Sequence, residues 1–245
     1  MISCICGLPG SGKNVYATHL AIKHYKKTNS LLKRIFRRIN HREILINNVY
    51  TSYPILLDKK KKIYSRIVTP DDLKNQYSFL PNAIIIIDEI QSFYDSDEYK
   101  HFPKKIGVFN QFHRHFGIRD IYYISQHPSR IVKKLRNVAC QFIKIRHFIQ
   151  IPFLKIGIMY YSNYYEFDDY GKWHHPPKEM KTYDVDNHFA FINLRQVFKS
   201  YNSVYLYALN YDKPLLDKGT FNHTYLTDEQ INHIFGNYIW TSRDK

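Results

Sequence analysis

The amino-terminal stretch of the chain reads Ile2-Ser3-Cys4-Ile5-Cys6-Gly7-Leu8-Pro9-Gly10-Ser11-Gly12-Lys13-Asn14. Its apolar start indicates a strand, its glycines indicate a tight turn, and the residues from Val15 to Lys26 have apolar side chains at helical spacing. Such a turn at the start of a helix directs backbone N–H groups and the helix dipole toward an anion, and the lysine reaches terminal phosphates. The stretch therefore predicts a binding loop for a nucleoside triphosphate.

Asn14 departs from the usual phosphate-loop pattern, in which a Ser or Thr hydroxyl at this position binds Mg²⁺. The asparagine side-chain carbonyl is still an oxygen donor that can serve Mg²⁺ directly or through water. The competing interpretation is a glycine turn that happens to carry a lysine. The residues predicted to bind the nucleotide are Gly7, Leu8, Pro9, Gly10, Ser11, Gly12, Lys13, Asn14 and Val15.

A second segment, Ala83 to Ile87, is an unbroken apolar run that ends in the acids Asp88 and Glu89. Such a run is typical of a strand buried on both faces of a parallel sheet. In phosphate-loop ATPases the acid at the end of this strand organises Mg²⁺, and a following Glu can polarise the attacking water. We therefore expect Asp88, with Asn14, to hold the metal and Glu89 to act as the general base. The predicted ligands are ATP and Mg²⁺.

A third segment, Asp120 to Gln126, alternates apolar and aromatic residues and ends in polar ones. It predicts a strand that delivers Gln126 to the same sheet edge as Asp88, where open α/β sheets bind ligands. Gln126 is expected to orient the water or to sense the γ-phosphate; the alternative is a polar residue bonded to a loop. A helix from Val108 to Gly117 is predicted before this strand. His113 and His115 on it have no acid or cysteine at metal-ligand spacing.

Charge and composition limit the kinds of partner that the chain is expected to bind. The chain has 245 residues, with 36 Lys and Arg against 21 Asp and Glu and a net charge of +15, which favours a polyanionic partner: nucleic acid or an acidic membrane surface. Leu31 to Arg42 predicts a basic amphipathic helix, either a surface for DNA phosphates or anionic lipid or an ordinary solvated face. The three cysteines have neither disulfide nor zinc-site spacing, and we see no signal peptide and no spanning helix. The sequence therefore predicts a location in a reducing cytoplasm.

The remaining segments complete the expected organisation. A strand is predicted within Ile44 to Val49, an exposed turn at Lys59 to Lys62, a helix start at Thr69 to Asp72, and a loop near the nucleotide from Ile90 to Phe102. The second half predicts strands at 148–151, 156–161, 189–192 and 204–207, turns at 168–171 and 174–177, and a short capped helix at 227–235. We thus expect an α/β fold with a mostly parallel central sheet in residues 1–150, and a β-rich extension of that sheet in residues 151–245.

Several motifs together resemble a known family. They are Gly7-Leu8-Pro9-Gly10-Ser11-Gly12-Lys13, Ile86-Ile87-Asp88-Glu89, His113-Arg114-His115-Phe116-Gly117 with Asp120-Ile121, and Arg136. Over residues 1–150 the chain resembles the zonula occludens toxin-like family, which includes the filamentous phage assembly ATPases. The His-Arg-His segment is the most specific part, since generic ATPases do not carry it. The strand end Ser125-Gln126 is similar to that of the wider FtsK/HerA class of DNA-pumping ATPases.

The resemblance implies a ring-forming ATPase that couples ATP hydrolysis to moving or exporting phage DNA. It also favours Arg114 or Arg136 as the arginine that reaches a neighbouring subunit's γ-phosphate; a plain surface charge is the alternative for each. Family members commonly carry a membrane-spanning segment after the ATPase domain, so attachment here is expected through a partner or the basic helix. Two other functions stay open, namely a non-hydrolysing DNA-binding or structural phage protein and a small-molecule kinase.

Overall fold

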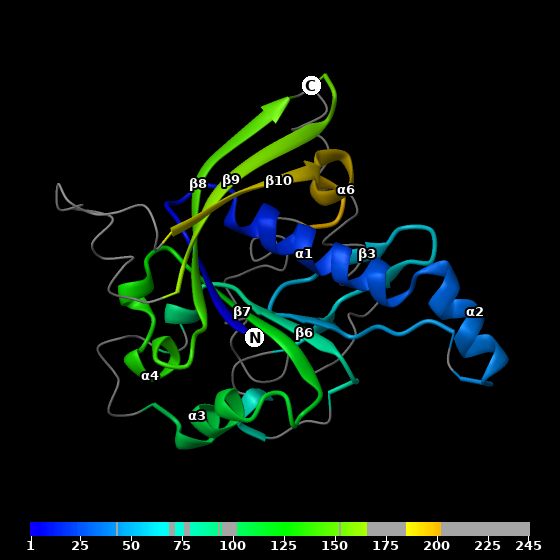
Figure 1. Ribbon diagram of the computed structural model, residues 1–245, viewed down its shortest axis with the longest axis horizontal. Coiled ribbons are helices and arrows are strands. Elements are labelled where there is room, and N and C mark those ends of the chain that lie inside the picture. Colours follow the sequence, from blue (N-terminus) through cyan, green and yellow to red (C-terminus); the bar gives the residue numbers. More distant parts are fainter. Residues whose placement is uncertain are drawn as a thin grey trace, which may run out of the picture.

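The computed structural model describes residues 1–42, 44–68, 72–75, 79–92, 94, 102–151, 153–165 and 185–201. Within them the chain forms a mixed α/β fold around one large sheet (Figure 1). The strands are β1 (Ile2–Cys6), β2 (Val49–Thr51), β3 (Leu56–Asp58), β4 (Ile63–Tyr64), β5 (Arg66–Ile67), β6 (Ala83–Ile87), β7 (Ile118–Ser125), β8 (Gln141–Ile151), β9 (Ile156–Tyr164) and β10 (Val185–Asn193). The α-helices are α1 (Lys13–Thr28), α2 (Leu31–Ile39), α3 (Lys104–Gln111), α4 (Lys133–Arg136) and α6 (Leu194–Phe198). Short 3₁₀ turns are η1 (Asp72–Asn75), η2 (Ile90–Ser92) and η4 (Pro128–Arg130).

The large sheet has the strand order β10-β9-β8-β1-β7-β6-β2-β5. Strands β8, β1, β7, β6, β2 and β5 pair in parallel. Strand β9 pairs antiparallel with β8, and β10 pairs antiparallel with β9. The predicted fold, a mostly parallel central sheet of the phosphate-loop type with a β-rich extension, is confirmed. The division into residues 1–150 and 151–245 stays a prediction.

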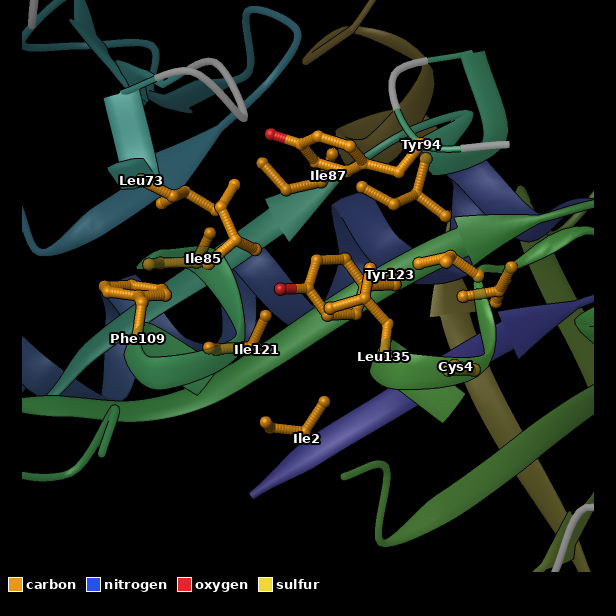
Figure 2. Close-up of a cluster of buried hydrophobic side chains, with 14 of the residues drawn as sticks. Ile2, Cys4, Leu73, Ile85, Ile87, Tyr94, Phe109, Ile121, Tyr123 and Leu135 are labelled. Atoms are coloured by element: carbon orange, nitrogen blue, oxygen red, sulfur yellow. The ribbon is translucent and has the colours of Figure 1, made fainter. Parts of the chain in front are cut away.

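The isoleucine run in β6 explains how the sheet is covered on both faces. All five residues of β6 are buried, and successive side chains point to opposite faces. Ile85 and Ile87 enter the cluster that packs with α3 and α4, which Figure 2 shows around Tyr123. Ile84 and Ile86 enter the cluster that packs with α1. Burying each such side chain stabilises the fold by about 1.5–3 kcal/mol, which favours an interior position for β6, between β7 and β2.

The strand predicted within Ile44 to Val49 is wrong in its placement, because β2 begins only at Val49. The side chain of Asn29 takes both backbone groups of Ile46: its Oδ1 accepts from the Ile46 N–H at 2.9 Å and its Nδ2 donates to the Ile46 carbonyl at 2.8 Å. The backbone groups of Ile46 are therefore hydrogen-bonded to the end of α1 and do not join a strand ladder.

The helix predicted from Val108 to Gly117 exists, but its bounds were wrong. Helix α3 begins after Pro103 and ends at Gln111. From there to Gly117 the backbone makes tighter bonds between residues three apart, such as His115 N–H to Phe112 C=O at 2.8 Å. Gly117, at φ +77°, closes these turns rather than α3.

Other expectations are confirmed with adjusted bounds. Helix α2, strand β7, the strands in residues 141–164 and 185–193, and the exposed lysine turn at Lys59 to Lys62 are all present. The helix start at 69–71, most of the loop at 90–102, the turns at 168–171 and 174–177, the strand at 204–207 and the helix at 227–235 lie outside the described residues. None of the helices in the described part of the chain has the length and apolar character needed to cross a bilayer.

Candidate nucleotide-binding site

Three parallel strands bring the predicted site residues to one edge of the sheet. Strand β7 lies between β1 and β6, with Cys6 opposite Ser125 and Ile87 opposite Tyr123. The segments that follow these strand ends start at Gly7, Gln126 and Asp88 and so leave the sheet at the same edge. The Gly7 N–H donates to the Gln126 carbonyl at 3.2 Å, which joins two of them directly.

The glycines of the loop are required by its backbone geometry. Gly10 and Gly12 have φ of +76° and +90°, in the left-handed region that side chains disfavour. A Cβ at Gly12 would also lie 3.0 Å from Met159 Cε and 3.2 Å from Phe148 Cδ1. Gly12 caps α1, a 16-residue helix with no acid in its first turn. The loop therefore ends at an uncompensated positive helix terminus, which suits an anion.

Lys13 lies folded under this loop. Its side chain is buried, and Nζ donates to the carbonyls of Gly7 at 2.7 Å and Leu8 at 3.0 Å. Burial lowers the pKa of Lys13, while the Glu89 and Asp88 carboxylates act in the opposite direction. The ammonium is thus held between the loop and the acidic end of β6.

Asn14 connects the start of α1 with Asp88. Its Nδ2 donates to Asp88 Oδ2 at 2.7 Å, while Asp88 Oδ1 accepts the Glu89 N–H at 2.9 Å. The Asp88 N–H in turn donates to Ser52 Oγ at 2.8 Å. The pKa of Asp88 is raised to about 6, chiefly by burial and then by the Glu89 carboxylate, against the lowering effects of Asn14, the Glu89 N–H and Lys13.

The same pair of residues fits a magnesium ion. Asn14 Oδ1 is buried and finds no hydrogen-bond partner among the described residues, and it is joined through its own amide to the Asp88 carboxylate. Carboxylate and amide oxygens are ligands that Mg²⁺ accepts, with substrate phosphates and water completing its shell. Asn14 and Asp88 would therefore hold the ion, which when bound neutralises charge on the phosphate oxygens.

Glu89 adopts an unusual backbone conformation beside this pair. Its φ of +47° is left-handed, which is uncommon for a residue with a side chain and is typical of functional sites. Its carboxylate Oε2 accepts a hydrogen bond from Gln91 Nε2, and its carbonyl accepts the Ser92 N–H at 2.8 Å. The turn of η2 thus fixes the direction of Glu89.

The other three predicted site residues, Gln126, Arg136 and Arg114, lie in different parts of the fold. Gln126 lies at the site edge, and its Oε1 accepts from Arg130 at 3.3 Å. Arg136 ends α4, and burial lowers its pKa. Arg114 is exposed in the turns before β7 and lines a hollow with Met1 and Asp120, where β1 and β7 begin. Arg114 is therefore at the sheet edge opposite the phosphate loop of its own chain, and its action on a neighbouring subunit stays a prediction.

Sequence reasoning missed two polar neighbours of the site, Ser52 and Gln91, which hydrogen-bond to Asp88 and Glu89, and it did not place Arg130 beside Gln126. Ser52 directly follows β2 and would have been found as a polar strand end if that strand had been placed correctly. Gln91 and Arg130 lie in 3₁₀ turns, whose side-chain directions have no periodic sequence signal.

The raised pKa of Asp88 predicts a pH-dependent stability. Because the folded pKa lies above the ordinary value of 3.8, the ionised carboxylate destabilises the nucleotide-free fold, and this cost disappears as the pH falls from about 6 to about 4. We expect Asp88→Asn to raise the thermal unfolding midpoint near pH 8, with a gain that shrinks near pH 5. Scanning fluorimetry measures this, with exposed Asp186→Asn as control. Equal shifts at both pH values would contradict the burial argument.

The family model described as Zonular occludens toxin (Zot) matches residues 1–151, and no curated protein matches the chain. Among solved structures, the N-terminal domain of zonular occludens toxin from Neisseria meningitidis is 15% identical with a TM-score of 0.49, covering 82% of this chain and 98% of that one.

A second similar structure is the genome packaging NTPase B204 from Sulfolobus turreted icosahedral virus 2 in complex with ATP-gammaS. It is 16% identical, with a TM-score of 0.40, and covers 62% of this chain and 75% of that one. The same protein in complex with AMPPCP is 15% identical, with a TM-score of 0.42, and covers 78% and 96%.

The matched residues 1–151 are more than half of the 245 in the chain. They include the phosphate loop, the acids after β6 and the His113-Arg114-His115 segment, which are the motifs on which the sequence resemblance rests. That resemblance is confirmed: the chain belongs to the zonular occludens toxin (Zot) family.

Proposed function

We propose that this protein binds ATP with Mg²⁺ and hydrolyses it, and that a homo-oligomeric ring of such chains couples hydrolysis to the movement or export of phage DNA during virion assembly. The observation that carries the nucleotide part is the 2.7 Å hydrogen bond between Asn14 and Asp88, which brings the phosphate loop and the acidic strand end into one site. Family membership supports the assembly part.

Each residue has a role that its position supports. The loop N–H groups and Lys13 hold the phosphates at the positive end of α1, and Asn14 with Asp88 binds the metal. Glu89, directed by the η2 turn, takes the proton of the attacking water. Gln126 lies at the mouth of the site, where it senses the γ-phosphate.

The net charge of +15 supports DNA as the polyanionic partner. We place the ring in the host cytoplasm, at the inner face of the cell membrane, with a membrane or membrane-assembly partner. The measurement that tests this function is ATP turnover by the purified protein with and without DNA. Stimulation by DNA, with DNA binding that weakens as salt rises, supports a pump. Turnover without DNA affinity even at low salt argues for a small-molecule kinase.

Two observations favour a second candidate, a protein that binds nucleotide for assembly but does not hydrolyse it. Asn14 stands where a metal-binding hydroxyl is usual. In addition, the Glu89 carboxylate accepts a hydrogen bond from Gln91, so one of its oxygens is already occupied. Tight ATP binding without Mg²⁺-dependent turnover, in the presence or absence of DNA, distinguishes this candidate from the pump.

Asn14 itself can be tested. Asn14→Ala removes an oxygen donor and the amide that orients Asp88, so we expect Mg²⁺-dependent turnover to fall by about 10- to 100-fold. Asn14→Thr supplies a hydroxyl in the usual position and is expected to retain turnover. The matched control is Asn40→Ala, because Asn40 is exposed at the end of α2. Full turnover by Asn14→Ala would remove this residue from the metal site.

A further inference from the structure

Helix α2 exposes its apolar side chains, which is the reverse of an ordinary packed helix. No residue of α2 is buried. The exposed fractions of its large apolar side chains are 63% for Leu31, 79% for Leu32, 48% for Ile35, 71% for Phe36 and 68% for Ile39. An exposed apolar cluster of this kind marks a surface that contacts another apolar phase.

The apolar and basic side chains of α2 lie on separate faces. At about 100° per residue, the five apolar side chains fall within a sector of about 140°, and the four basic side chains fall on the remaining surface. Arg38 lies about 20° from one side of the apolar sector, Lys33 and Arg34 each lie about 60° from one of its two sides, and Arg37 lies near the middle of the opposite face. Lys33 and Arg38 are exposed, whereas Arg34 and Arg37 are half-buried. This is the distribution of a helix that lies in a lipid headgroup layer, with cations at the boundary.

Arg37 fixes α2 so that the apolar face points away from the protein. Its guanidinium donates to the Thr28 carbonyl at 2.6 Å, to Asn29 Oδ1 at 3.1 Å and to the Ile44 carbonyl at 3.2 Å. These contacts attach the polar face of α2 to the end of α1. Figure 1 shows α2 projecting at the periphery of the molecule, beyond the end of α1.

We propose that α2 is a docking helix for an anionic lipid bilayer, with its apolar face in the acyl boundary and Lys33 and Arg38 on lipid phosphates. The segment from Ser30 to Arg42 contains five Lys and Arg residues and no acid, so its charge complements anionic headgroups. DNA would engage the cations but leave the outward apolar face in water, so lipid accounts for both faces. The proposal concerns a surface apart from the nucleotide site and does not depend on ATP hydrolysis.

The test is sedimentation of the full chain with vesicles of equimolar phosphatidylcholine and phosphatidylglycerol, and separately with phosphatidylcholine alone. We expect binding to the anionic vesicles, weakened about tenfold or more by Leu32→Glu with Phe36→Glu, since both apolar anchors become charged. Lys33→Gln with Arg38→Gln is expected to weaken binding several-fold, to about the level seen with phosphatidylcholine alone. All four side chains lie on the surface, and circular dichroism checks that the variants fold.

Two controls separate docking by α2 from other causes. Lys60→Gln with Lys61→Gln removes the same charge from the exposed lysine turn, and we expect it to leave vesicle binding unchanged. An equal loss from this pair would overturn the proposal in favour of general electrostatic attraction. Sedimentation velocity tests a second copy as the occupant: if Leu32→Glu with Phe36→Glu disrupts self-association while vesicle binding persists, the proposal is wrong. Absence of binding by the unmodified chain would also overturn it.

Discussion

Replacing Lys13 with alanine is expected to reduce ATP turnover by about 100- to 1,000-fold, the effect of losing one preorganised charge from a phosphoryl-transfer site. The ammonium is held by the carbonyls of Gly7 and Leu8, beside the acids that follow β6. It is already desolvated there, so it meets a phosphate without losing a full water shell. Nucleotide binding should fall with turnover, because the lysine contacts the ground state and the transition state alike.

The control for this prediction lies on the same helix. Lys23 is exposed on α1, so Lys23→Ala removes the same charge and the same side chain without touching the loop. Fluorescent ATP-analogue binding and phosphate release measure both variants, and the thermal unfolding midpoint checks that Lys13→Ala is folded. Turnover by Lys13→Ala equal to that of Lys23→Ala would remove the loop from the catalytic site.

The parts of the fold that the sequence predicted are those in which burial alone decides structure. In β6, four successive isoleucines are β-branched and apolar, and a short strand covered on both faces hides all of them. The elements that were misplaced depend instead on hydrogen bonds that the apolar pattern does not show. Asn29 holds Ile46 out of a strand, and the turns after α3 replace a continuous helix. Such contacts join distant or irregular segments, and no local periodicity encodes them.

The candidate site shows the same division. The spacing of the glycines to Lys13, and of the apolar strand to Asp88, is local and was readable. The bond between Asn14 and Asp88 joins residues 74 positions apart, and the sequence only allowed it to be expected from the shared sheet edge. Gln91, the hydrogen-bond partner of Glu89, has no motif of its own. Its effect on Glu89 can be found only by placing both side chains.

The hydrogen bond between Gln91 and Glu89 offers a way to test the role of Glu89. We expect Glu89→Gln to bind ATP as the unmodified protein does and to lose turnover by about 10²- to 10⁴-fold, since glutamine fills the same space but cannot accept the proton of the attacking water. Binding is spared because the phosphates are held by the loop and α1, not by Glu89.

The matched variant changes the partner rather than the acid. Gln91→Ala leaves the Glu89 carboxylate in place but removes the hydrogen bond that directs it, so we expect turnover to fall by less than in Glu89→Gln while ATP binding is kept. Single-turnover hydrolysis measured together with ATP binding checks both variants. If the Glu89→Gln protein hydrolyses ATP at the original rate, the general base is another residue, because this variant leaves the loop, Lys13 and Asp88 unchanged.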